Sequence, residues 1–123
     1  MELVQWLTNI CKSETPDKTI VAFYFGIYQT VEGYEMYLSG SKEYSDCDND
    51  WASGSDFVPR EKYLALDITQ YKNLEWQDLL EKVKKELLDF KKTEMFESSF
   101  FNVAKAIAVG FDDGDLHFID TKV

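Results

Sequence analysis

The sequence has few of the residues that build disulfide scaffolds, metal sites and membrane spans. Its 123 residues include two cysteines, Cys11 and Cys47, and one histidine, His117. Neither cysteine lies in a CxxC or CxxH pattern, which argues against a disulfide scaffold and favours a reducing, cytoplasmic location. No apolar run approaches about 20 residues, and the acidic start of the chain is unlike a signal peptide. We therefore expect a single domain over residues 1–123 and no membrane segment.

Positive charge is also scarce. The chain has 13 basic and 23 acidic residues, for a formal net charge of -10. Such a surface repels nucleic acid at long range, so direct nucleic-acid binding is not expected, whereas a basic protein or a cation would suit it. The hydrophobic share of 45% and the aromatic share of 15% exclude intrinsic disorder and predict a packed core.

The motifs of common catalytic and nucleotide-binding sites are missing as well. The sequence has no GxGxxG segment, no Walker loop and no GxSxG turn, and it has no second histidine for a metal. His117 lies in an expected strand, where a structural role is the commoner one. The carboxylates of Asp112, Asp113 and Asp115 are explained by turn chemistry. We expect no catalytic residues, no metal and no cofactor, and therefore no enzyme.

Helical spacing of apolar residues predicts two main helices. Residues 2–12 form an amphipathic pattern. Residues 74–90 form the clearest helix, with Glu81 and Lys85 placed to pair on its wet face. The apolar stripe expected along this second helix consists of Trp76, Leu80, Val83, Leu87 and Phe90. Residues 94–102 are expected to hold a short helical turn.

Strand signals predict two hairpins. Residues 19–28 are β-branched and aromatic throughout, as in a central strand, and residues 34–38 alternate as their hairpin partner. Residues 62–66 are expected to form a short strand, and residues 105–111 and 116–119 flank a strong turn signal. The sequence therefore predicts an α+β fold: a small single-domain sandwich with an antiparallel, hairpin-built sheet of about 4–5 strands and two main helices on one face.

The candidate site is the stretch from Asp46 to Pro59, DCDNDWASGSDFVP, called the acidic loop below. It follows neither helical nor strand periodicity, and it gathers carboxylates and large aromatic side chains. Ordered loops of this kind commonly contact a metal, a cation or a basic protein. The hypothesised partner-binding residues are Asp46, Asp48, Asp50, Trp51, Asp56 and Phe57.

Two alternatives bear on this loop. Its first three aspartates match the first ligand spacings of a calcium loop, but Trp51 stands where that loop needs glycine and Phe57 where it needs glutamate. The spacing therefore argues against calcium. Trp51 and Phe57 can also fold inward and pin the loop to the core, or Trp51 can serve as an interface anchor. The sequence leaves these two roles open.

Three segments carry a resemblance to a known family. They are YEMYLSGSKEYSDCDNDWASGSDFVP at residues 34–59, WQDLLEKVKKELLDF at residues 76–90 and AKAIAVGFDDGDLHFI at residues 104–119. Together they resemble small bacterial immunity proteins of polymorphic toxin and contact-dependent growth inhibition systems. The resemblance implies a cytosolic protein without catalysis that binds one cognate toxin domain tightly. It implies no catalytic residues and does not fix which surface binds.

The leading hypothesis is an immunity protein whose acidic surface binds and neutralises a toxin domain, expected to be a basic nuclease. Nucleases need basic surfaces to hold phosphates, so an acidic inhibitor gains association rate and charge complementarity. The alternative is a small-ligand or metal-binding α+β domain, which would need a formed pocket beside the loop. A third alternative is an accessory subunit of a larger assembly.

Overall fold

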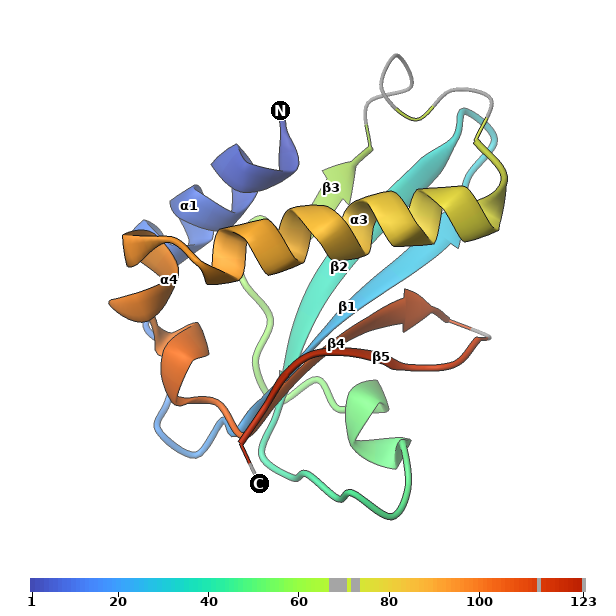
Figure 1. Cartoon of the computed structure of the whole chain (residues 1–123). Helices are drawn as coiled ribbons and strands as arrows, with labels where there is room; N and C mark the ends of the chain where they lie inside the picture. The colour runs from blue at the N-terminus through green and yellow to red at the C-terminus, as the bar shows by residue number, and fades with distance from the viewer. Residues whose placement is uncertain (67–70, 72–73, 113, 123) are drawn as a thin grey trace.

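The computed structural model describes residues 1–66, 71, 74–112 and 114–122. The connection expected over residues 67–73 lies, apart from Tyr71, outside the described residues. Figure 1 shows the arrangement of the elements. They are, in chain order, α1 (Leu3–Ser13), β1 (Ala22–Gln29), β2 (Tyr34–Ser41), the 3₁₀ turn η1 (Asp50–Ser53), β3 (Tyr63–Ala65), α3 (Trp76–Lys91), α4 (Glu94–Glu97), the 3₁₀ turn η2 (Phe100–Val103), β4 (Ala106–Phe111) and β5 (His117–Thr121).

The strands form one mixed sheet in the order β3-β2-β1-β4-β5. The two predicted hairpins are present, because β1 pairs with β2 and β4 pairs with β5, both antiparallel. Between the hairpins, β1 and β4 run parallel, with Ala22 opposite Ala106 and Ile27 opposite Phe111. Parallel neighbours need a long crossover, which the chain supplies through α3, α4 and η2. The predicted α+β class is confirmed, with five strands and two main helices. The predicted antiparallel sheet is corrected to a mixed one, because local hairpin signals do not specify how the two hairpins join each other.

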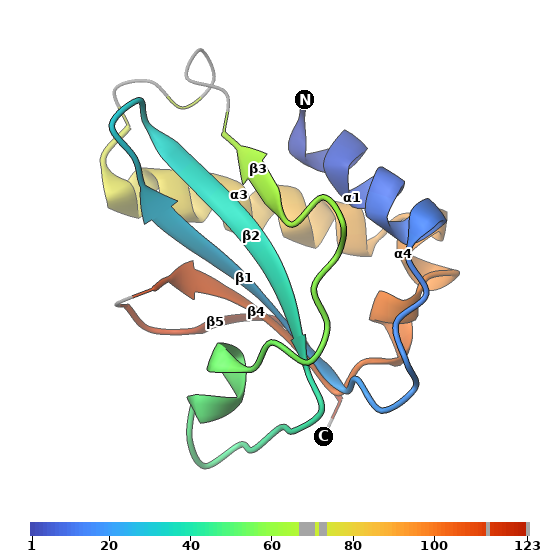
Figure 2. The same ribbon diagram turned by 180° about the vertical axis from the view of Figure 1, so that it is seen from behind.

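One face of the sheet packs on the helices (Figure 1). Alternate side chains of the central strands, among them Phe23, Phe25 and Ile27 of β1, enter a core that also holds Leu7 of α1 and Val83 of α3. Because side chains alternate across a strand, the residues between them face the opposite side. That opposite face is covered in part by the acidic loop, as the view from behind shows (Figure 2).

Helix α3 buries a slightly different stripe from the predicted one. Leu80, Val83, Leu87 and Phe90 are buried as expected, and so is Leu79. Trp76, predicted to be buried, is instead 53% exposed because it stands at the first position of the helix, where its indole packs edge-on against Phe111 at 5.8 Å between ring centroids.

The predicted ion pair on α3 forms with a different lysine. Glu81 pairs with Lys84 at 3.4 Å rather than with Lys85. Positions three apart also adjoin each other on a helix surface, so this pair uses the other short spacing. His117 of β5 lies on the helix side of the sheet, where its Nδ1 is 3.5 Å from Nζ of Lys84. This contact fits the structural role expected of the histidine.

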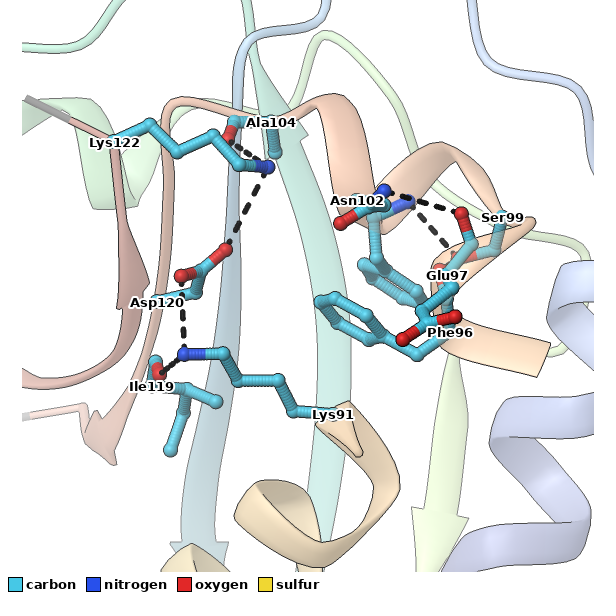
Figure 3. A network of polar contacts seen from close by, with 10 residues as sticks. Lys91, Phe96, Glu97, Ser99, Asn102, Ala104, Ile119, Asp120 and Lys122 are labelled. Atoms are coloured by element: carbon cyan, nitrogen blue, oxygen red, sulfur yellow. Dashed lines mark hydrogen bonds and ion pairs between the residues drawn. The ribbon is translucent and has the colours of Figure 1, made fainter. Parts of the chain in front are cut away.

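A small polar network fastens the end of α3 to the edge strand β5 (Figure 3). Lys91 Nζ lies 3.1 Å from Asp120 and donates to the carbonyl of Ile119 at 3.3 Å. Lys122 Nζ lies 3.7 Å from the other oxygen of Asp120 and donates to the carbonyl of Ala104 at 3.4 Å. Lysines at an edge strand also discourage pairing with strands of other chains.

Candidate functional site

The acidic loop lies over the sheet face opposite the helices (Figure 2). Its four aspartates are all exposed: Asp46, Asp48, Asp50 and Asp56. Of the two aromatic side chains of the loop, Trp51 is buried and Phe57 is half-buried. The structure therefore separates the six predicted binding residues into a charged outer set and an inward-facing aromatic pair.

Trp51 is buried, with 4% of its surface exposed. Its indole packs on small residues of the sheet, including Ala22, Ala106 and Ala108, and on Tyr44 at 5.4 Å between ring centroids. Alanines on neighbouring strands leave the space that the indole fills. Trp51 therefore folds inward and pins the loop to the core. In this conformation it is not an exposed interface anchor.

Phe57 is half-buried and is joined to β2 by backbone hydrogen bonds. The amide of Gly40 donates to the carbonyl of Phe57 at 2.8 Å, and the amide of Phe57 donates back at 3.1 Å. Its ring lies 6.1 Å from those of Phe23 and Phe100, in the helix-side core. Phe57 thus fixes the end of the acidic loop to the sheet.

The aspartates of the loop also organise its backbone. Asp48 Oδ1 accepts from the amide of Asp50 at 3.0 Å, and Asp56 Oδ2 accepts from the amide of Lys42 at 2.9 Å. The Asp48 contact, to the backbone two residues on, is typical of a tight turn, whereas the Asp56 contact ties the loop to the residue that follows β2. Among the described residues, no three histidine, cysteine, aspartate or glutamate side chains are grouped so as to hold a metal ion.

Beside the loop, the same sheet face carries a cluster of tyrosines that the sequence reasoning missed. Tyr28 of β1, Tyr37 of β2 and Tyr63 of β3 lie 6.2–6.4 Å apart between ring centroids. Gly26 makes this possible, because a Cβ atom there would lie 2.2 Å from Cζ of Tyr37. The sequence does place tyrosines and a glycine at alternate positions of residues 24–28, which puts them on one face of a strand. Whether that face meets tyrosines of other strands depends on the strand register, which the sequence does not specify.

A hollow of about 330 Å³ opens at this cluster. We call it the tyrosine hollow and define it by Tyr28, Tyr37, Tyr63, Lys62 and Asp112. Residues 52, 53 and 55 of the acidic loop also line it. A second hollow of about 360 Å³ shares Tyr37 and Asp112 and continues toward Leu116. The acidic loop and the tyrosine hollow therefore form one continuous surface.

The tyrosine hydroxyls are held by neighbouring acceptors. Tyr28 donates to Glu35 at 2.9 Å and Tyr37 donates to Asp112 at 2.6 Å, while Tyr24 donates to the carbonyl of Gly110 at 3.1 Å. Burial, with a contribution from the charge of Asp112, raises the pKa of Tyr24 to about 12. Partial burial and the Glu35 carboxylate raise the pKa of Tyr28 to about 12, and burial together with Asp112 raises the pKa of Tyr37 further. All three hydroxyls are therefore protonated donors at neutral pH.

These raised pKa values predict a loss of stability in alkaline solution. Tyrosines in the unfolded chain ionise at a pKa of about 10, whereas Tyr24 and Tyr28 retain their protons up to about pH 12 in the folded state. The stabilisation is therefore complete below about pH 10 and is lost as the pH rises through the folded-state values. We expect the free energy of unfolding, measured by urea denaturation, to fall steadily above pH 10.

The matched variants for this prediction are Tyr24→Phe and Tyr44→Phe. Tyr24→Phe removes one of the hydroxyls whose pKa is raised, so the free energy of unfolding should fall less steeply above pH 10 in this variant. Tyr44→Phe is the control, because its hydroxyl forms no hydrogen bond within the described part of the chain. If the free energy of unfolding falls equally steeply above pH 10 in both variants and in the parent, the prediction is contradicted.

Lys62 places a positive charge over the tyrosine cluster. Its Nζ lies 5.3 Å from the ring centroid of Tyr37 and 5.1 Å from that of Tyr63. Both distances are within the range of a cation–π interaction. The hollow therefore already stabilises one cationic group, supplied by the chain itself.

None of the described helices has the length and apolar character needed to cross a membrane. Comparison of the chain with protein-family models, curated proteins and solved structures found no match.

Proposed function

We propose that this protein is an immunity protein that binds a cognate bacterial toxin domain, such as a basic nuclease, and neutralises it in the cytoplasm. The proposal rests on the acidic loop: four exposed aspartates are carried by a segment that Trp51 and Phe57 fasten to the sheet. Preorganised carboxylates lose little entropy on binding and form charge-assisted hydrogen bonds with lysine or arginine. The protein acts by occupying the toxin's surface and performs no chemistry itself.

The net charge of -10 supports the same proposal. A toxin that holds phosphates presents lysines and arginines, so opposite charges accelerate the encounter of the two proteins. The first experiment is a pull-down with the product of the adjacent gene as bait. The expected partner is the variable C-terminal domain of a long secreted protein, and the complex should lack toxin activity.

Removing the charge of the loop should weaken this complex. In the variant Asp46→Asn/Asp48→Asn/Asp50→Asn, each amide retains an acceptor oxygen, so the turn bonds of the loop persist while three charges disappear. We expect the dissociation constant to rise roughly 10- to 100-fold, mainly through slower association and with a weaker salt dependence. Surface plasmon resonance at several salt concentrations measures both effects.

The matched control removes three charges elsewhere. The variant Asp89→Asn/Glu94→Gln/Glu97→Gln changes exposed residues at the end of α3 and in α4, on the helix side of the sheet. Its dissociation constant should rise less than threefold. If the two triple variants weaken binding equally, net charge alone steers association and the acidic loop is not the binding surface.

A small-ligand-binding domain is the second candidate, and the hollow of about 330 Å³ beside the loop favours it. Small-molecule sites commonly span about 300–1,000 Å³. This candidate predicts a thermal shift with a metabolite in the absence of any protein partner, and unchanged ligand affinity in the triple loop variant. A thermal-shift screen distinguishes it from the immunity function.

A further inference from the structure

The tyrosine hollow has the composition of a site for a cationic side chain. Three aromatic rings, from Tyr28, Tyr37 and Tyr63, lie within 6.2–6.4 Å of one another on three adjacent strands. The face of an aromatic ring carries negative electrostatic potential and attracts ammonium and guanidinium groups. Lys62 shows that these rings accept a cation, since its Nζ lies over two of them.

The carboxylates around the rings are not neutralised by ion pairs. Asp112 and Glu35 each accept a hydrogen bond from a tyrosine hydroxyl, which leaves further lone pairs on each carboxylate. Within the described residues, neither carboxylate forms an ion pair. Two carboxylates thus lie beside rings over which the ammonium of Lys62 is placed, so a cationic group that takes the place of Lys62 also meets negative charge.

We propose that the tyrosine hollow receives an arginine side chain of the basic partner, which displaces the ammonium of Lys62 from the rings. This inference rests on the proposed function and names the group that the partner inserts. Arginine suits the hollow better than lysine because its planar guanidinium stacks on aromatic rings and donates two parallel hydrogen bonds to one carboxylate, here Asp112. The chain's own Lys62 then acts as an internal competitor for the site.

Competition by Lys62 predicts a gain of affinity on mutation. Lys62→Gln removes the resident cation and should tighten partner binding roughly 3- to 10-fold. Its control, Lys105→Gln, makes the same charge change at an exposed position beside the start of β1, whereas Tyr28 of the hollow lies near the end of that strand. Asp112→Asn should weaken binding roughly 10-fold, because the charge that receives the guanidinium is lost. Tyr63→Ala removes one exposed ring and should also weaken binding.

A second experiment needs no protein partner. The blocked tripeptide acetyl-Gly-Arg-Gly-amide is titrated into the protein, with the citrulline tripeptide as its neutral counterpart, and the tyrosine ring resonances are followed by NMR. We expect saturable shifts of Tyr28, Tyr37 and Tyr63 with the arginine peptide alone, and tighter binding in Lys62→Gln. Equal shifts with both peptides, or no shift in Lys62→Gln, would overturn the inference.

The two experiments also separate this inference from the proposed function. If a toxin binds and the triple loop variant weakens binding, but Lys62→Gln behaves as Lys105→Gln and Asp112→Asn binds as tightly as the parent, the immunity function stands and the arginine site is wrong. If the arginine peptide binds the hollow but the neighbouring gene product does not bind the protein, the cation site stands and the immunity function is wrong.

Discussion

Replacing Trp51 with alanine is expected to lower the free energy of unfolding by about 3–5 kcal/mol, a large part of the about 5–15 kcal/mol that stabilises a typical domain. The indole is the largest side chain between the acidic loop and the sheet, and it is 4% exposed. Its loss would leave a cavity over Ala22, Ala106 and Ala108. Urea denaturation followed by far-ultraviolet circular dichroism measures the change without relying on the removed fluorophore.

Two other tryptophan variants sharpen this prediction. Trp76→Ala is the matched control, because Trp76 is 53% exposed and its loss should cost about 1 kcal/mol or less. Trp51→Phe should cost clearly less than Trp51→Ala, because phenylalanine keeps an aromatic ring in the space over the alanines and leaves a smaller cavity. Neither variant loses a hydrogen bond, because the indole Nε1 of Trp51 has no hydrogen-bond partner within the described residues. Equal losses from Trp51→Ala and Trp76→Ala would contradict the buried role.

The same variants connect the core to the proposed function. Trp51→Ala releases the loop from the sheet, so the partner should bind more weakly because the loop must be ordered again on binding. Trp51→Phe keeps an aromatic ring under the loop and should bind the partner almost as tightly as the parent. An anchor residue would behave differently, with lost affinity and unchanged stability.

The helices were predictable because their signal is local. Leu3, Trp6, Leu7 and Ile10 recur at helical spacing, and all four are buried in α1. Trp76 was the exception, since spacing alone does not tell whether the first residue of a helix reaches the core. The hairpins were likewise predictable from local alternation and turn residues, whereas the parallel join of β1 to β4 depends on how the chain crosses between them.

The candidate site was only partly predictable, because some of its features follow from local sequence and others depend on contacts between distant segments. Exposure of the four aspartates follows from their charge, because carboxylates are rarely buried without a partner. The direction of Trp51 depends on the alanines of β1 and β4, which are distant in sequence and adjacent only in the folded sheet. The tyrosine hollow joins three strands and residue 112, so its existence follows from strand register that no local pattern specifies.

The second large effect is expected at Phe101, on the helix side of the sheet. Phe101 of η2 is 1% exposed and its ring lies 4.5 Å from that of Phe100, 5.1 Å from Phe23, 5.9 Å from Phe25 and 6.1 Å from Phe96. It therefore joins the end of the crossover to the central strand. Aromatic pairs contribute about 0.5–1.5 kcal/mol beyond their buried area, so Phe101→Ala should cost about 3–5 kcal/mol or more.

Phe118→Ala provides the matched control for Phe101→Ala. Phe118 is 44% exposed on the opposite face, where its ring lies 6.4 Å from Trp51, so its removal should cost about 1 kcal/mol. If the parallel join depends on Phe101, hydrogen exchange in Phe101→Ala should accelerate most at the amides of β4, while Phe118→Ala leaves them protected. Uniform acceleration across all strands, or equal losses of stability in the two variants, would show that Phe101 has no special role in holding β4 beside β1.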